Sequence, residues 1–187
     1  ESTRAVDTVL LDKTGTVTTG QMSLAEVVPA PGVDGATLLR VAGAAEAASA
    51  HPVARAIALA AAAQGPVPHV EDFVSLDGLG VVGTVEGRAA VVGRLRLFEE
   101  RAMSVPDQVA SAVSAAQQRG ATAVVVGWDG MARGMIAVSD TVKPSSADAV
   151  RELRRLGLRP ILLTGDNQAA AAHVAQQVGI DEVVEIG

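Results

Sequence analysis

The chain has 187 residues, 49% of them hydrophobic, and it contains two Phe, one Trp, no Tyr and no Cys. The missing cysteines exclude disulfides and thiol catalysis, and a net charge of −6 without a basic run argues against nucleic acid as the main partner. No stretch approaches the roughly 18 to 20 consecutive apolar residues that span a bilayer, and the N-terminus lacks the layout of a signal peptide, so we expect a soluble, monomeric, cytoplasmic chain.

The first predicted element is a strand over Thr8–Leu11, followed directly by the polar turn Asp12-Lys13-Thr14-Gly15-Thr16-Val17-Thr18. A strand that ends in an aspartate and a Gly-containing turn presents one carboxylate to a ligand. A carboxylate placed in this way can attack phosphorus and become an acyl phosphate. Lys13 and the N–H groups of the turn would offset the repulsion between carboxylate and phosphate. The alternative is an ordinary strand-to-loop turn.

The middle of the chain predicts an antiparallel sheet with flanking helices. Pro52 is expected to open a helix, which places His51 at or beside its N-cap. Glu86-Gly87 and Asp129-Gly130 are typical hairpin turns. The predicted helices are 37–48, 52 onward and 106–120, and the predicted strands are 73–76, 80–85, 88–92, 121–128 and 131–138.

The last part of the chain, like the first, has an apolar strand followed by a polar turn that contains glycine. A helix is predicted from Pro144 to about Leu156, then a strand over Ile161–Leu163, the turn Thr164-Gly165-Asp166-Asn167 and a helix over 168–178. Two such turns are expected to lie side by side at the carboxyl ends of neighbouring parallel strands, where α/β sheets bind ligands. We therefore predict one domain built from 1–19 and 139–187, with a second domain, 20–138, inserted into it.

The segment DKTGTVT resembles the phosphorylation motif of P-type ATPases, ion pumps with a haloacid-dehalogenase-like core. The resemblance implies an α/β fold: a partial Rossmann-type phosphorylation domain carrying an inserted α+β nucleotide-binding domain on an antiparallel sheet. Thr14 stands where the wider superfamily has an acid/base aspartate, which should slow hydrolysis of the aspartyl phosphate. Asp140 and Lys143 resemble the Asp-x-x-Lys hinge of the family. The implied catalytic residues are Asp12, Lys13, Thr14, Thr164, Gly165 and Asp166, with Asp12 and Thr14 also holding Mg²⁺.

A second resemblance, to the heavy-metal branch of these pumps, concerns the nucleotide. Glu46 and His51-Pro52 match the Glu and His-Pro of the branch's Ser-Glu-His-Pro region, although Ala50 replaces the Glu before the histidine. Glu46 and His51 lie about 140° apart on an ideal helix, so they converge only if the helix ends between them. The resemblance implies that the imidazole stacks on adenine and that Glu46 accepts from its amine, favouring ATP over GTP. The implied nucleotide-binding residues are Glu46, His51, Gly78, Gly80, Val81, Gly93 and Arg94, the last standing where the family has Asn.

Together these motifs imply the ATP-binding and partial phosphorylation region of a heavy-metal-transporting P-type ATPase. ATP and Mg²⁺ are the expected cofactors, and the actuator and transmembrane domains of the parent chain, at the cytoplasmic face of a membrane, are the expected partners. Copper(I) export is expected from the frequency of copper pumps in this branch; Zn²⁺, Cd²⁺ and Co²⁺ remain open. Because the family's lysine and Gly-Asp-Gly-x-Asn-Asp loop are missing, we expect the chain to bind ATP without phosphorylating Asp12. The alternatives are a soluble haloacid-dehalogenase-like phosphatase and a non-catalytic nucleotide-binding module.

Overall fold

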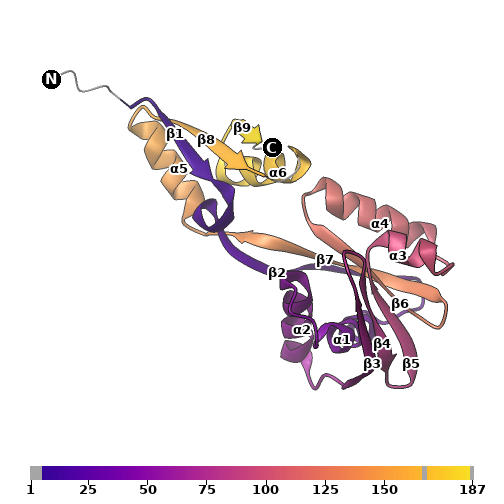
Figure 1. The fold of residues 1–187 in the computed structure, drawn as a ribbon. Helices are drawn as coiled ribbons and strands as arrows, with labels where there is room; N and C mark the ends of the chain where they lie inside the picture. Colours follow the sequence, from indigo (N-terminus) through magenta and orange to yellow (C-terminus); the bar gives the residue numbers. More distant parts are fainter. Residues whose placement is uncertain (1–5, 166–167, 186–187) are drawn as a thin grey trace. The chain divides into compact units, whose positions relative to one another are not determined.

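The structure, a computed structural model, describes residues 6–165 and 168–185. The chain forms two compact units (Figure 1). The first unit comprises residues 1–21, 118–120 and 140–187, and the second comprises 22–117 and 121–139. Two long strands, β2 (Thr18–Pro29) and β7 (Met131–Val142), each begin in one unit and end in the other.

The first unit is a three-stranded parallel sheet in the order β1-β8-β9. Its strands are β1 (Thr8–Asp12), β8 (Arg159–Thr164) and β9 (Glu182–Glu185). The helices α5 (Ser146–Arg155) and α6 (Gln168–Val178) pack against β8, as parallel strands require helical crossovers. The apolar core is made of Val17, Val150, Leu162, Ala175, Val178 and Ile180.

The second unit is built on a six-stranded sheet in the order β2-β7-β6-β5-β4-β3. The strands β3 to β7 pair antiparallel, each with the next. The bounds not yet given are β3 (Val70–Leu76), β4 (Gly80–Val85), β5 (Arg88–Gly93) and β6 (Thr122–Trp128). Both predicted hairpin turns are confirmed: both residues of Glu86-Gly87 and of Asp129-Gly130 have positive φ, the conformation of a type I′ turn.

Helices cover both faces of this sheet, because its strands alternate between two apolar clusters. Val92 belongs to a cluster with α1 (Gly35–Glu46) and α2 (Pro52–Gln64). Its neighbour Val91 belongs to the opposite cluster, with α3 (Leu95–Glu100) and α4 (Asp107–Gln118). Figure 1 shows α1 and α2 on one side of the strands and α3 and α4 on the other. The predicted fold class, an α/β unit with an inserted antiparallel α+β unit, is confirmed.

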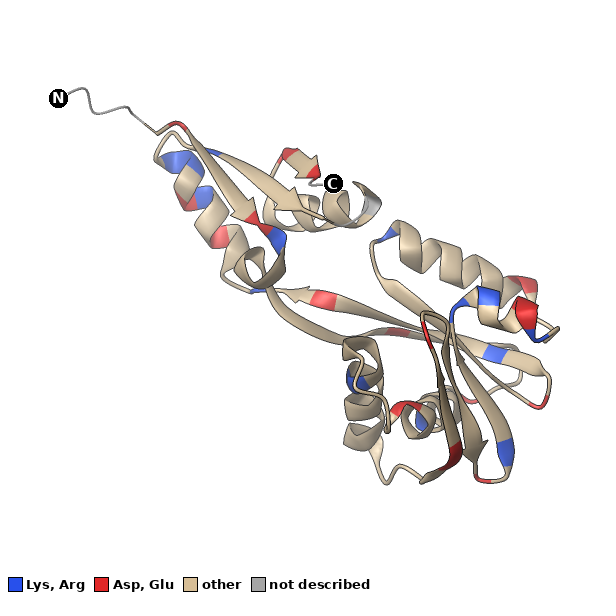
Figure 2. Ribbon diagram, in the orientation of Figure 1, with Lys and Arg blue, Asp and Glu red and all other residues tan. Residues whose placement is uncertain are grey.

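Some element bounds differ from the sequence predictions. The first helix ends at Glu46 rather than at residue 48, and the helix predicted from Pro144 begins at Ser146. The strands β2 and β9 and the short helix α3 were not predicted. Arg151, Arg154 and Arg155 are paired with Asp148, Asp181 and Glu152, respectively. Figure 2 shows basic and acidic residues side by side along α5.

Candidate functional site

The two polar turns predicted to meet lie on neighbouring strands. Asp12, the last residue of β1, is in register with Leu163 of β8, and Thr164 is the next residue of β8. The Asp12 side chain is exposed, whereas Thr164 is 3% exposed. Gly165 forms an exposed bend, and Asp166 lies outside the described residues. Asp12 and Thr164 thus stand at the carboxyl ends of adjacent parallel strands, the usual ligand site of such sheets.

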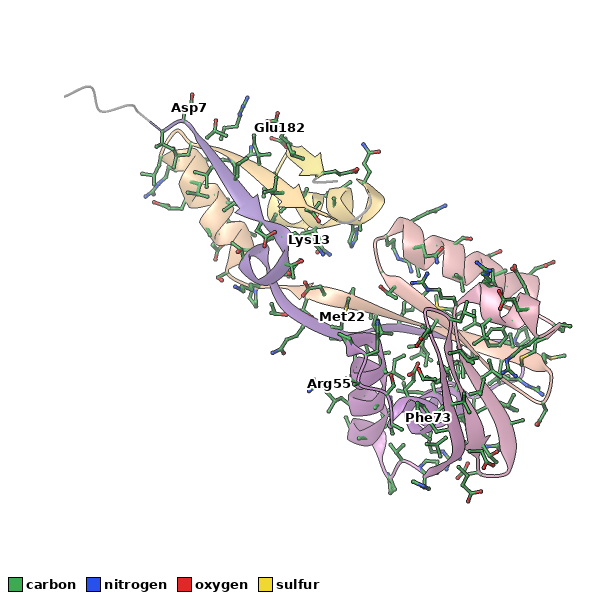
Figure 3. All side chains as sticks on the ribbon, in the orientation of Figure 1. Asp7, Lys13, Met22, Arg55, Phe73 and Glu182 are labelled. Atoms are coloured by element: carbon green, nitrogen blue, oxygen red, sulfur yellow. The ribbon has the colours of Figure 1, made fainter. Side chains whose placement is uncertain are left out.

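The turn after Asp12, Lys13–Val17, is closed on itself. The backbone N–H and the Oγ1 hydroxyl of Thr18 both approach the Lys13 carbonyl, with 2.9 Å between the Oγ1 and Lys13 oxygens. Gly15 has φ +79°, a conformation that favours glycine. Lys13 itself is 8% exposed and lies at the end of β1 (Figure 3). The backbone in this turn is therefore fixed while the Asp12 carboxylate stays accessible.

The returning segment 140–146 holds the same turn from outside. Lys143 Nζ donates to the Gly15 carbonyl at 2.6 Å, and Lys143 N–H donates to the Val17 carbonyl at 3.0 Å. The Ser146 hydroxyl donates to the same Val17 oxygen at 2.7 Å. Asp140 Oδ2 lies 2.5 Å from Thr18 Oγ1. We call these contacts the clamp: Thr18, Asp140, Lys143 and Ser146, acting on the turn Lys13–Val17.

The clamp gives a structural role to the predicted hinge residues and adds two that sequence reasoning missed. Asp140 and Lys143 were expected from the hinge resemblance, but Thr18 and Ser146 were not predicted as site residues. Thr18 is the last residue of the DKTGTVT motif, so the motif could have indicated it as a site residue. No motif in the sequence includes Ser146. The second carboxylate oxygen, Asp140 Oδ1, is buried and has no hydrogen-bond partner among the described residues.

The predicted Mg²⁺ ligands, Asp12 and Thr14, are both exposed beside this turn. Magnesium prefers oxygen ligands and is commonly bound by one or two carboxylates, water and substrate phosphates. The donor set of one exposed carboxylate and an adjacent backbone therefore fits Mg²⁺ bound together with a phosphate. Within residues 6–165 and 168–185, no three His, Asp or Glu side chains gather into a metal-binding group.

Glu46, predicted to contact the nucleotide, is the last residue of α1 and is 6% exposed. Burial raises the pKa of its carboxyl from 4.5 to about 7. No ion pair or hydrogen bond to this carboxyl is found among the described residues. Glu46 is thus a largely buried acid without a protein partner among the described residues.

His51 occupies the predicted N-cap of α2, and Pro52 is the first helical residue. The His51 Nδ1 atom accepts a hydrogen bond from Val53 N–H at 3.3 Å. The side chain is exposed, which leaves a ring face and Nε2 available to a ligand.

The predicted glycine elements meet where β4 and β5 pair. A Cβ on Gly80 would lie 2.2 Å from the Val92 carbonyl oxygen, and one on Gly93 would lie 2.3 Å from the Leu79 oxygen. Glycine at both positions is therefore required by the approach of the two backbones. A Cβ on Gly78 would meet nothing within 4 Å, so among these three only Gly78 faces open space. Arg94 is exposed, and its backbone N–H donates to the Leu79 oxygen at 2.8 Å.

One apolar cluster connects the predicted nucleotide elements. The cluster contains Ala45, next to Glu46, and Val53, two positions after His51. It also contains Val81, next to Gly80, and Val92, next to Gly93. Val81, itself a predicted site residue, is 3% exposed and packs in this core rather than facing solvent. All the predicted nucleotide residues belong to the second unit, whereas the described catalytic residues belong to the first.

Comparison with known proteins gives a match over nearly the whole chain. The family model "haloacid dehalogenase-like hydrolase" matches residues 6–186. A copper-exporting P-type ATPase of Mycobacterium leprae is 48% identical over 184 residues, covering 98% of this chain and 23% of the relative. A probable copper-exporting P-type ATPase V of Mycobacterium tuberculosis is 41% identical over 185 residues, and a silver exporting P-type ATPase of Salmonella typhimurium is 39% identical over 184 residues. These cover 98% of this chain and 24% and 22% of the relatives.

Solved structures agree with this likeness. A zinc-transporting PIB-type ATPase in its E2.Pi state superposes with a TM-score of 0.86 at 32% identity, over 96% of this chain and 29% of that one. The catalytic CPx-ATPase domain CopB-B has a TM-score of 0.62 at 25% identity, over 96% and 60%. The chain spans about a quarter of the length of the curated relatives. In the described residues, no helix is both long and apolar enough to cross a membrane.

Proposed function

We propose a function from the premise that the chain belongs to the haloacid dehalogenase-like hydrolase family. It is the ATP-binding and partial phosphorylation region of a heavy-metal-transporting P-type ATPase that exports Cu(I) through an aspartyl-phosphate intermediate. The first unit is the phosphorylation domain and the second is the nucleotide-binding domain. In the parent protein they work with actuator and transmembrane domains at the cytoplasmic face of the membrane.

The observation that carries this proposal is the register of Asp12 with Leu163, which places the proposed nucleophile beside Thr164. Asp12 attacks the terminal phosphorus of ATP, the bond from that phosphorus to the bridging oxygen breaks, and ADP leaves with the electron pair. The Thr164 hydroxyl would donate to an oxygen of the transferred group. Lys13 and the N–H groups of the turn supply positive charge nearby, and Mg²⁺ held by Asp12 and Thr14 would neutralise charge on the phosphates. Thr14 offers no carboxyl group to activate water, which favours a persistent phosphoenzyme.

The choice of copper follows from the relatives. Proteins at 41% and 48% identity are named copper exporters, whereas the superposed PIB-type ATPase at 32% identity is named for zinc. Identity over this region is thus higher to the copper exporters. The choice of copper is tested by measuring metal uptake into vesicles that contain the parent pump, with Cu⁺, Ag⁺ and Zn²⁺ compared. Uptake of Zn²⁺ alone would contradict the choice.

The nucleotide site is tested by calorimetric titration with ATP and with GTP. We expect ATP to bind more tightly, and we expect His51→Asn to weaken ATP binding about tenfold, or roughly 1.4 kcal/mol. Asparagine is chosen because it is a strong N-cap residue and so replaces the bond from Val53 N–H while removing the ring.

A matched control is His69→Asn, which replaces an exposed loop histidine outside the proposed site. It should leave ATP affinity unchanged within about twofold. Equal ATP affinity in wild type and His51→Asn would remove His51 from the site, and absence of ATP binding by the wild type would contradict the proposed function itself.

A further inference from the structure

The protonation state of Glu46 determines which base it can recognise. Its carboxyl lies in the last turn of α1, is 6% exposed and has no partner among the described residues. The partial negative charge at a helix C-terminus disfavours an anion there. A carboxylate in this place is largely withdrawn from water and has no cation paired with it among the described residues, and burial of this kind favours the protonated form.

The charged groups on the elements around α1 do not offset this. On α1 itself, Arg40 is paired with Glu86, and Arg88 of β5 is paired with the same carboxylate. On α2, Arg55 is exposed and projects away from α1 (Figure 3). β4 carries no charged residue, and β3 carries two acids, the exposed Glu71 and Asp72. These acids would only disfavour ionisation of Glu46.

His51 opens the next helix, and its Nδ1 accepts from Val53 N–H. Among the described residues, no ion pair or hydrogen bond joins His51 to Glu46.

A neutral carboxyl group and a carboxylate have different hydrogen-bonding patterns. The neutral acid offers one O–H donor and one C=O acceptor, whereas the carboxylate only accepts. Adenine presents an amino donor beside a ring-nitrogen acceptor, the edge that Asn and Gln read with two hydrogen bonds. The neutral acid has the same donor and acceptor pair. Guanine presents two neighbouring donors, N1–H and the N2 amino group, which suit an ionised carboxylate.

We propose that Glu46 binds the adenine of ATP as the neutral acid, so that ATP affinity and the preference for ATP over GTP both decline as pH rises. The inference rests on the proposed function, because it concerns the base held at the same nucleotide site.

The size of the effect follows from the pKa of about 7 that burial gives the Glu46 carboxyl. If only the neutral form binds adenine, the apparent Kd scales with the inverse of the neutral fraction. The Kd for ATP should then rise about tenfold between pH 6 and pH 8. The Kd for GTP should stay constant or fall over the same range.

The test is a calorimetric titration of the whole chain with ATP and GTP at pH 6, 7 and 8, for wild type and Glu46→Gln. Glutamine keeps one donor and one acceptor at every pH. We expect Glu46→Gln to bind ATP as tightly as the wild type does at pH 6 and to lose the part of the pH dependence that is due to Glu46. Titration of the γ-phosphate of ATP affects both proteins equally, so their difference isolates Glu46.

Glu71→Gln is the matched control, since it removes an exposed carboxylate from β3 of the same unit. It should retain the wild-type pH slope. Loss of ATP binding in Glu46→Gln at pH 6, with the variant folded by circular dichroism, would overturn the inference by showing that the anion is required. The same ATP slope in wild type and Glu46→Gln would also overturn it. Absence of ATP binding by the wild type at every pH would overturn the proposed function together with it.

A measurement on the wild type alone avoids any dependence on the variant's folding. The ¹³C resonance of the Glu46 carboxyl can be followed through pH with and without adenosine, which has no phosphate. Adenosine should raise the midpoint of the titration, because it binds the neutral form. A lowered midpoint would overturn the inference.

Discussion

Glu46 makes the stability of the second unit depend on pH. Its pKa is raised by burial from 4.5 to about 7, so between these values the folded chain holds a proton that the unfolded chain releases. The stabilisation is complete below pH 4.5, declines as pH rises and is lost above about pH 7. At one pKa unit per 1.4 kcal/mol, the total loss is on the order of 3 kcal/mol.

We therefore expect Glu46→Gln to match wild type at pH 4.5 and to be more stable by roughly 2 to 3 kcal/mol at pH 8. Urea unfolding followed by the fluorescence of Trp128, which packs in the same apolar cluster as α1 and α2, gives both values. Glu71→Gln should show no such trend. An equal difference at the two pH values would show that the carboxyl is not titrating in the folded chain.

At this scale the sequence indicated a local role for His51 but not the burial of Glu46. The N-cap role of His51 followed from Pro52, because proline favours the first helical position. The burial of Glu46 could not be predicted, since it depends on packing between α1, α2 and the sheet. Gly80 and Gly93 were predicted to be nucleotide-binding residues, and the structure shows that each is needed by the backbone of the neighbouring strand. Whether they also contact nucleotide stays a prediction.

At the scale of elements, α1 and α2 pack closely because the residues between them are small. A Cβ on Gly43 of α1 would lie 2.3 Å from the Cβ of Ala61 in α2, so Gly43→Ala forces the helices apart. We expect a loss of about 1 to 3 kcal/mol, the usual cost of overpacking, measured by Trp128 fluorescence in urea.

The same helix offers a control with the opposite sign. Gly35 is the first residue of α1, and the atoms nearest to an added Cβ are 3.9 and 4.0 Å away. Gly35→Ala should stabilise the chain by about 0.4 to 1 kcal/mol, because alanine restricts the unfolded chain without a clash. If both variants were destabilised, the loss at Gly43 could not be assigned to its contact with Ala61.

Elements with a local signal were predicted, and elements defined by distant partners were not. The hairpins at Glu86-Gly87 and Asp129-Gly130 have their turn chemistry in two adjacent residues. β2 has no regular alternation of buried and exposed residues; it is a strand because it pairs with β7. α3 has six residues, too few to show a helical period.

At the scale of the whole chain, Thr18 supports one unit and not the other. Its hydroxyl lies between Asp140 Oδ2 and the Lys13 carbonyl, and the side chain is fully buried. Thr18→Val keeps the shape and leaves the Asp140 carboxylate without its hydroxyl partner. A buried group left unpaired costs about 1 to 3 kcal/mol, and we expect a loss of that size in the first unit.

The two units can be followed separately, since the single tryptophan, Trp128, lies in the second. Thr18→Val should lower the midpoint of part of the circular dichroism transition and leave the fluorescence midpoint in place. Thr19→Val, at an exposed neighbour, should change neither. A shift of the fluorescence midpoint by Thr18→Val would show that the units unfold as one.

The clamp also shows where sequence reasoning stops. The two polar turns, after Leu11 and after Leu163, were predicted to be neighbours because parallel strands end at a common edge of the sheet. In the structure they follow the adjacent parallel strands β1 and β8. The bonds from Lys143 and Ser146 to the turn join residues 128 and 129 positions apart. No local pattern in the sequence specifies contacts of that range.

Thr18 and Asp140 are 122 positions apart in the sequence, and their side-chain oxygens are 2.5 Å apart. The first unit therefore holds together the two segments through which the chain enters and leaves the second unit. The entropic cost of closing a loop grows only slowly with its length. Second units of very different length could therefore be inserted between Thr18 and Asp140 at a similar entropic cost. Insertions in the second unit can then be accommodated without disturbing the turn that carries Asp12.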